Sequence, residues 1–273
     1  MADTDPSAFH DFEHAGWERA AECYGDAFGG LTAQTAGPLL EAAGVVAGMR
    51  VLDVASGPGF IAGAASALGA LVTGLDFSAA MVAEAQRRQP AITFCEGDAE
   101  ALPFEDASVD AVVMNFGMLH LARPDTAIAQ ARRVLRPGGR YAFTVWASPG
   151  QALAFGMVLR ALEEFGNRNV PLPEGPPFFR FSDAIETRRT LEQAGYAAIE
   201  VRELPLAWRL TSADAVFEAM SRGGVRTAAV LRAQTPDALA AIRAAVGRDV
   251  EGYAVEGGFS IPMPAVLASA TRT

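Results

Sequence analysis

The chain has 273 residues, 51% of them hydrophobic, and a net charge of −10 at pH 7. This length suits one large α/β domain or a core domain with a cap, and the acidic charge is not typical of nucleic-acid-binding proteins, which present a basic face. All 22 basic residues are arginine. The absence of lysine excludes Schiff-base chemistry, the phosphate loop that ends in Gly-Lys, and the tyrosine–lysine pair of short-chain dehydrogenases.

The N-terminal segment, residues 1–14, is acidic and has no apolar core, so it does not resemble a signal peptide. The most apolar window, residues 60–75, is too short to span a bilayer. The two cysteines, Cys23 and Cys95, are too few and too far apart for a disulfide framework or a zinc ribbon. We therefore expect a cytoplasmic protein with reduced cysteines, a buried Cys95 and no membrane span.

The first two segments, residues 1–45 and 46–150, have different patterns. Residues 11–45 predict two helices with a polar break at residues 29–35. From residue 46 onward, short apolar strands alternate with helices. The predicted strands are 49–54, 70–77, 92–97, 109–116 and 139–146, and the helices include 78–89 and 125–135. This alternation predicts a parallel sheet that is covered on both faces.

The third segment, residues 151–273, has a looser pattern. We expect it to complete the sheet and to add a helical cap that includes the substrate region. The predicted elements are a helix at 150–165, a loop rich in proline and phenylalanine at 167–183, a helix at 183–194, a strand at 199–210, alanine-rich helices to about residue 248 and a last strand at 257–272.

Acidic residues end three successive predicted strands, next to the glycines Gly57 and Gly59. Ligands of doubly wound sheets bind at this edge. Asp53 would repel a pyrophosphate and favour a cation, Asp76 can accept both hydroxyls of a ribose, and Asp98 can accept from an adenine amino group. Together they suit a cationic adenosine compound without phosphates, such as S-adenosylmethionine. Alternatively, Asp53 and Asp76 are helix N-caps and Asp98 is a turn residue.

Four stretches resemble class I S-adenosylmethionine-dependent methyltransferases, in the small-molecule branch that includes ubiquinone-pathway enzymes. They are VLDVASGPG, GLDFSAAMVAEA, EGDAEALPFEDASVDAVV and RVLRPGGRYAFTVW, in order between residues 50 and 146. Residues 16–45 resemble the helical lid of that family, whereas residues 150–258 carry little resemblance. The resemblance implies a Rossmann-like, doubly wound, seven-stranded sheet with an antiparallel last strand, an N-terminal helical lid and a helical insertion before the last strand. The family's usual Gly-Cys is Ala55-Ser56 here, and both residues are small.

The resemblance also implies the cofactor S-adenosylmethionine, the product S-adenosylhomocysteine and a set of binding residues. Around the methionine portion it places Asp53, Ala55, Ser56, Gly57 and Gly59. At the ribose and adenine it places Asp76, Phe77, Ser78, Met81, Gly97, Asp98 and Ala99. Near the methyl sulfonium it places Asn115, Phe116 and Gly117. Trp17, Tyr24 and Thr32 are candidates to line the lid over the cofactor; alternatively, Trp17 and Tyr24 anchor their helix in the core.

His120 is the candidate catalytic base, because it follows the fourth strand and an imidazole can take a proton from an oxygen or nitrogen nucleophile. Alternatively, it orients the substrate or caps the next helix. His10 and His14 are spaced as metal ligands with Glu13 nearby, but an acidic, frayed terminus favours a solvated face. We therefore expect no metal.

Five aromatic residues are candidates for an apolar wall of the substrate pocket, or else for a packed loop core: Trp146, Phe155, Phe178, Phe179 and Phe181. The stretch GPPFF, residues 175–179, is similar to a motif of enzymes that methylate nucleobase amino groups. That motif follows the fourth strand, where this chain has NFGM, so nucleic-acid methylation is not expected.

The sequence thus predicts methyl transfer from S-adenosylmethionine to a small molecule, apolar or aromatic. The methylated atom and the oligomeric state stay open. A non-catalytic module that binds the cofactor is one alternative. A nicotinamide-dependent oxidoreductase is another, disfavoured by the glycine spacing, Asp53 and the missing lysine.

Overall fold

The computed structural model describes residues 5–273; residues 1–4, part of the N-terminal segment predicted not to be a signal peptide, lie outside the described residues. A seven-stranded sheet with the order β3-β2-β1-β4-β5-β10-β6 forms its centre. The first five strands pair in parallel, and β10 is antiparallel to both of its neighbours. The predicted Rossmann-like sheet with an antiparallel last strand is therefore confirmed.

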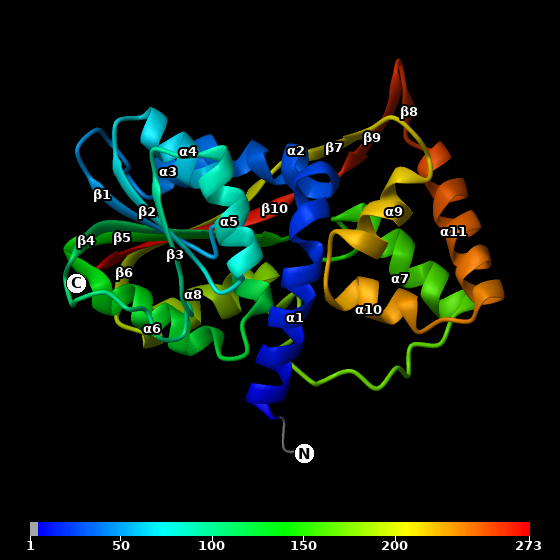
Figure 1. Cartoon of the computed structure of the whole chain (residues 1–273), viewed down its shortest axis with the longest axis horizontal. Coiled ribbons are helices and arrows are strands. Elements are labelled where there is room, and N and C mark those ends of the chain that lie inside the picture. Colours follow the sequence, from blue (N-terminus) through cyan, green and yellow to red (C-terminus); the bar gives the residue numbers. More distant parts are fainter. Residues whose placement is uncertain (1–4) are drawn as a thin grey trace.

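The strands of this sheet are β1 (Arg50–Val54), β2 (Leu71–Asp76), β3 (Thr93–Glu96), β4 (Val109–Asn115), β5 (Leu135–Trp146), β6 (Tyr196–Leu204) and β10 (Ala265–Arg272). The helices are α1 (Pro6–Tyr24), α2 (Gly30–Thr32), α3 (Ala36–Ala42), α4 (Phe60–Ala67), α5 (Ala79–Arg88), α6 (Pro124–Val134), α7 (Leu153–Phe165), α8 (Ala184–Gln193), α9 (Ala215–Arg222), α10 (Arg226–Arg232) and α11 (Pro236–Glu251). Helices α3, α4 and α5 cover one face of the sheet and α6 and α8 the other (Figure 1). Because both faces are covered, the central strands are almost wholly buried, as in β1 and β4.

The N-terminal segment differs from the predicted pair of helices. Helix α1 continues into a π-helical turn, η1 (Gly25–Gly29), then α2, a 3-10 turn, η2 (Ala33–Thr35), and α3. The predicted break is helical because its polar side chains bond back to the helix. The hydroxyls of Thr32 and Thr35, both buried, donate to the carbonyls of Phe28 and Thr32, at 3.1 and 2.7 Å.

The C-terminal segment contains a second sheet that the sequence analysis did not predict. It has the order β7-β9-β8, with β7 (Ala207–Leu210), β9 (Gly258–Pro262) and β8 (Ala254–Val255). The strand predicted at 199–210 is divided between β6 and β7 by Pro205, and the one predicted at 257–272 between β9 and β10 at Pro264. Proline lacks the N–H that a continuing strand would need.

The predicted helical insertion before the last strand consists of α9, α10 and α11. It packs with α7 in a cap beside the sheet, and α1 lies between this cap and α5 (Figure 1). Residues 151–273 complete the seven-stranded sheet with β6 and β10, and the division of the chain at residues 45 and 150 stays a prediction. Cys95 is half-buried rather than buried. Within residues 5–273, every helix is too short or too polar to cross a membrane.

Candidate active site

A cavity lies at the carboxyl ends of the central parallel strands, where the turns after these strands meet the N-terminal helices. Its empty space, counted out to the solvent at its mouth, is about 790 Å³. Fifteen of the eighteen predicted cofactor-binding residues line it: Trp17, Tyr24, Thr32, Asp53, Ala55, Ser56, Gly57, Asp76, Phe77, Met81, Gly97, Ala99, Asn115, Phe116 and Gly117. Five other residues line it that were not predicted: Pro58, Phe60, Ile61, Leu75 and Leu121.

Three predicted cofactor-binding residues lie outside this lining. Gly59 precedes α4 with a φ of 80°, and a Cβ there would lie 2.9 Å from the ring of Phe94. Ser78 is fully buried and its hydroxyl caps α5. Asp98 accepts a hydrogen bond from the N–H of Glu100, 2.8 Å away, which fits the alternative of a turn residue. All three shape the turns around the cavity, and their contact with the cofactor stays a prediction.

Asp53 is the one carboxylate at the floor of this cavity that lacks a partner. It is 1% exposed, and within residues 5–273 neither of its oxygens accepts a hydrogen bond of acceptable geometry. Burial raises the pKa of Asp53 to about 8; the backbone N–H of Ala62 opposes this shift, and the charge of Asp76 adds to it. An unpartnered buried carboxyl is costly, so Asp53 is suited to a cationic group that a ligand brings.

Asp76 connects the turn after β1 with the turn after β2. Its oxygens accept hydrogen bonds from the N–H groups of Gly57 and Ser78, at 2.8 and 3.0 Å. Burial raises the pKa of Asp76 to about 6, although both hydrogen bonds oppose the shift. Each oxygen retains a lone pair for a ligand hydroxyl. The helix-capping alternative for Asp53 and Asp76 is wrong, because Gly59 and Ser78 hold the two N-cap positions.

The N-terminal lid is fastened to the sheet through Asn115 at the end of β4. Its side-chain oxygen accepts from the hydroxyl of Thr144, 2.5 Å away, and lies 2.7 Å from the hydroxyl oxygen of Thr35, whose single hydrogen is shared between this oxygen and the carbonyl of Thr32. Its amide nitrogen donates to the carbonyl of Thr32, 3.2 Å away. The polar atoms of Asn115 are therefore used to hold the lid, and its contact with the methyl sulfonium stays a prediction.

The solvated, frayed terminus predicted around His10 and His14 is wrong. Helix α1 begins at Pro6, and both imidazole rings lie edge-on to Phe77, with ring centroids 5.7 and 5.4 Å away. Glu13, between them in the sequence, is fully buried. Helix α1 packs against α5, and both histidines are half-buried rather than solvated.

A second cavity, of about 510 Å³ of empty space, adjoins the first. Five residues line both cavities: Trp17, Tyr24, Thr32, Phe116 and His120. The rest of the second lining comes from Phe28, Trp146, Phe155, Phe178, Met220 and residues 223–227. Apart from His120 and Arg226, the side chains of this wall are uncharged and mostly aromatic.

Only part of the predicted aromatic wall faces this second cavity. Trp146, Phe155 and Phe178 line it, whereas Phe179 and Phe181 do not. Phe181 is 3% exposed and packs against the ring of Phe143, and Phe179 lies edge-on behind Phe178, with centroids 4.9 Å apart. Phe181 fits the predicted alternative of a packed loop core, and a contact of the half-buried Phe179 with the acceptor stays a prediction.

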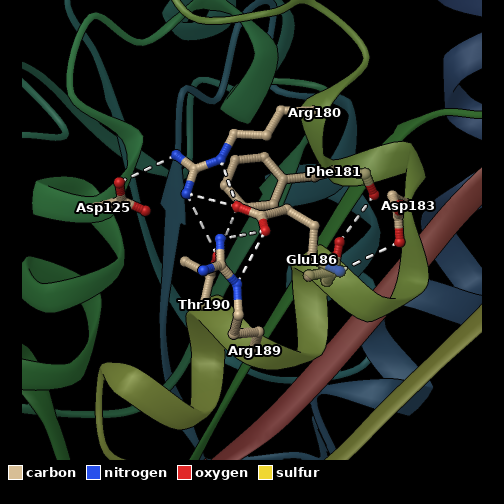
Figure 2. A network of polar contacts seen from close by, with 8 residues as sticks. Asp125, Arg180, Phe181, Asp183, Glu186, Arg189 and Thr190 are labelled. Atoms are coloured by element: carbon tan, nitrogen blue, oxygen red, sulfur yellow. Dashed lines mark hydrogen bonds and ion pairs between the residues drawn. The ribbon is translucent and has the colours of Figure 1, made fainter.

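Arg180 holds the end of this loop in place, between α6 and α8. Figure 2 shows its guanidinium between the carboxylates of Asp125 and Glu186, each 3.0 Å away. The same group lies 4.8 Å from the centre of the Phe181 ring. Partly exposed ion pairs contribute little singly, but a network that shares one guanidinium fixes its geometry. Arg180 thus anchors the end of the loop that carries Phe178.

His120 lies in η3 (Met118–His120), where the two cavities meet. Its Nδ1 lies 3.0 Å from the carboxylate of Glu13, and its ring is edge-on to Trp17, with centroids 4.8 Å apart. The other oxygen of Glu13 accepts from Nε of Arg226, 2.8 Å away. Sequence reasoning considered Glu13 only as a metal ligand and missed Arg226, because no local pattern relates residues 107 and 213 positions apart.

Comparison with known proteins gives the family. The family described as "Methyltransferase domain" matches residues 52–143. The demethylmenaquinone methyltransferase of Renibacterium salmoninarum is 37% identical over 175 residues, which cover 61% of this chain and 74% of that protein. The chain belongs to the S-adenosylmethionine-dependent methyltransferases.

A further sequence relative agrees with this assignment, and a solved structure shares the fold. The ubiquinone/menaquinone biosynthesis C-methyltransferase UbiE of Rubrivivax gelatinosus is 39% identical over 104 residues, covering 38% of this methyltransferase and 41% of the relative. The phosphoethanolamine N-methyltransferase 2 of Haemonchus contortus, solved with S-adenosyl-L-methionine, has the same fold, with a TM-score of 0.59 and 20% identity over 97% of this chain and 60% of that one. The predicted class I, small-molecule branch is confirmed, and the nicotinamide-dependent alternative is wrong.

The methyltransferase uses S-adenosylmethionine to methylate a small-molecule acceptor, and the larger cavity fits this cofactor. The cofactor carries an ammonium group and a sulfonium but no phosphate. The buried, unpartnered carboxyl of Asp53 suits the first charge, and the free lone pairs of Asp76 suit ribose hydroxyls. Gly57 lets the backbone approach closely, with a φ of 50° and open space where a Cβ would lie.

Proposed function

We propose that this methyltransferase methylates a flat, apolar aromatic molecule that binds in the second cavity and carries an ionisable hydroxyl. The observation that carries this proposal is the shared wall of the two cavities, where His120 and Phe116 border both. A molecule in the second cavity can therefore present its reacting atom to a methyl group held in the first. The relatives named as demethylmenaquinone and ubiquinone/menaquinone methyltransferases are consistent with such an acceptor.

The chain's own residues would act mainly by positioning and by excluding water. Bound S-adenosylmethionine supplies the electrophilic methyl group. Asp53 and Asp76 hold its amino-acid and ribose portions, and the stacked rings of Phe116 and Trp146, 4.0 Å apart, form the wall beside the reacting centre. Holding nucleophile and methyl carbon about 3 Å apart in a dry site lowers the barrier by removing the entropy of encounter.

His120 would accept the proton of the acceptor hydroxyl on Nε2. Its ring is 15% exposed and held edge-on by Trp17 and Phe178, so it reaches the junction of the cavities in one fixed orientation. Removing that proton makes the oxygen, or the ring carbon conjugated to it, a stronger nucleophile. The chain's acidity and the narrow aromatic cavity disfavour a nucleic-acid acceptor. The cytoplasmic location stays a prediction.

Thermal unfolding with S-adenosylhomocysteine, followed by an acceptor screen, tests the proposal. A ligand at 100 times its Kd stabilises by about 2.7 kcal/mol, and Asp76→Ala should abolish the shift. A panel of hydroxylated aromatics, matched methyl ethers and aliphatic amines is then assayed for methyl transfer. Turnover of the hydroxylated aromatics alone supports the proposal. Turnover of the amines, or of the methyl ethers at equal rates, contradicts it.

A further inference from the structure

We propose that Glu13 of helix α1 is a positioning residue that sets the tautomer of His120 and so leaves Nε2 free to accept a proton. The inference rests on the proposed function for its catalytic consequence, but the tautomer itself does not depend on it. Glu13 is fully buried and supplies one oxygen to His120 and the other to Arg226.

Arg226 binds the second carboxylate oxygen of Glu13. Its guanidinium donates to Glu13 through Nε, and its other two nitrogens donate to the carbonyls of Pro176 and Leu119, at 2.9 and 2.7 Å. Arginine stays protonated in proteins, and an ionised carboxylate beside it can only accept hydrogen bonds. Arg226 also stacks on Phe9 of α1, 4.4 Å from the ring centre. The Glu13–Arg226 pair therefore joins three segments: α1, the first turn of α10 and the loop before Phe178.

Because the Glu13 carboxylate can only accept hydrogen bonds, it decides which ring nitrogen of His120 carries the hydrogen. Nδ1, 3.0 Å from the carboxylate, must carry the hydrogen, so the lone pair of the neutral ring lies on Nε2. Within residues 5–273, Nε2 has no hydrogen-bond partner, and the ring lines both cavities. The His120 ring contacts Glu13 and Trp17 of α1 and the ring of Phe178. Trp17 and Phe178 are uncharged, and Glu13 in turn contacts the charged side chain of Arg226 in α10.

The proton and electron balance of the transfer follows from this arrangement. The acceptor's O–H proton passes to Nε2 as an oxygen electron pair forms the bond to the methyl carbon. The carbon–sulfur bond breaks, and its electron pair stays on sulfur. The imidazolium so formed is stabilised by Glu13 until it returns its proton to solvent. With the opposite tautomer, Nε2 would carry a hydrogen and the ring could not accept the proton.

Glu13→Gln gives a test with little change in shape. Arg226 can only donate, so the amide oxygen must face Arg226, and the amide nitrogen then faces Nδ1. Nδ1 becomes an acceptor and the hydrogen moves to Nε2. Glu22→Gln, on the exposed face of the same helix, is the matched control. We expect Glu13→Gln to lower kcat by 100-fold or more, with the Kd for S-adenosylhomocysteine changed less than twofold and Glu22→Gln unaffected.

Nitrogen-15 NMR of the imidazoles in the full chain decides the tautomer. The chain has three histidines, and the signals lost in His120→Gln identify that ring. The wild type should show a protonated Nδ1 and an unprotonated Nε2 near pH 7.5, and Glu13→Gln the reverse. A wild-type ring protonated on Nε2, or an unchanged tautomer in folded Glu13→Gln, overturns the inference. If the tautomer is as stated but no acceptor is methylated, only the proposed function fails.

Discussion

The Cβ of Ala55 occupies the space that a side chain at position 117 would need. A Cβ on Gly117 would lie 2.6 Å from it and 2.9 Å from Cγ of Met114. Ala55 itself has a φ of 54°, in the left-handed region that favours glycine, and it stands where the family usually has glycine. The turns after β1 and β4 thus approach closely beside the larger cavity.

We expect Gly117→Ala to lower the free energy of unfolding by about 1–3 kcal/mol, because the added methyl overpacks this contact. The backbone of Gly117 is ordinary, with a φ of −80°, so the cost is steric. Ala55→Gly should stay within about 1 kcal/mol of the wild type, because relief of the left-handed strain offsets the added chain entropy. In the double variant the loss should be smaller than the sum of the single effects. Urea unfolding of all four proteins measures this; strict additivity would show that the two positions do not compete.

Asp53→Asn should stabilise the protein in the absence of ligand. The folded-state pKa of Asp53 is about 8, above the usual value of 3.8. Between these values the folded protein retains a proton that the unfolded chain has lost, so this group lowers stability as pH rises from about 4 to about 8. Asparagine carries no such penalty. The free energy of unfolding of Asp53→Asn should therefore exceed that of the wild type by an amount that grows from pH 4 to pH 8 and reaches about 1–3 kcal/mol at pH 8. Denaturation at pH 5, 6.5 and 8 tests this, and a constant difference would contradict it.

Cofactor binding should release a proton through the same residue. A bound ammonium group requires the ionised form of Asp53, which in the free protein predominates only above about pH 8. The affinity for S-adenosylhomocysteine should thus rise up to about tenfold per pH unit between pH 6 and pH 8. Calorimetry at pH 7 in phosphate and in Tris should give different enthalpies for the wild type and equal ones for Asp53→Asn. Equal wild-type enthalpies would show that Asp53 does not titrate on binding.

Phe178 and Phe181 should respond differently to truncation, although they are three residues apart. Phe178 lines the second cavity, so Phe178→Ala should raise KM for an aromatic acceptor about tenfold and leave the Kd for S-adenosylhomocysteine unchanged. Phe181 is buried against Phe143, so Phe181→Ala should instead cost about 3–5 kcal/mol of stability. Steady-state kinetics and thermal unfolding of both variants separate the two roles. An unchanged KM in Phe178→Ala would remove this ring from the acceptor site.

Much of the core was predictable from the sequence, because its signals are local. A parallel strand that is buried on both faces appears in the sequence as a short apolar run. The turn after such a strand contains glycine and acidic residues, and their spacing in the sequence depends only on the lengths of that strand and that turn. Asp53, Gly57 and Asp76 therefore fall at the cavity as predicted. The predictions failed where proline divided a strand, as at Pro205, and where polar side chains bonded back onto a helix, as at Thr32 and Thr35.

The sequence by itself determined the parallel core strands and the acids at their ends, since these follow from hydrophobic periodicity and short spacings. The seven-stranded sheet and the family came from the resemblance of its motifs to known methyltransferases. Only the tertiary structure decided that Glu13 and Arg226 meet at His120. It also decided that Phe178 faces a cavity while Phe179 and Phe181 do not. Contacts between α1, α10 and the turn after β4 depend on how separate elements pack, and no local pattern encodes the face that each side chain presents once they are packed.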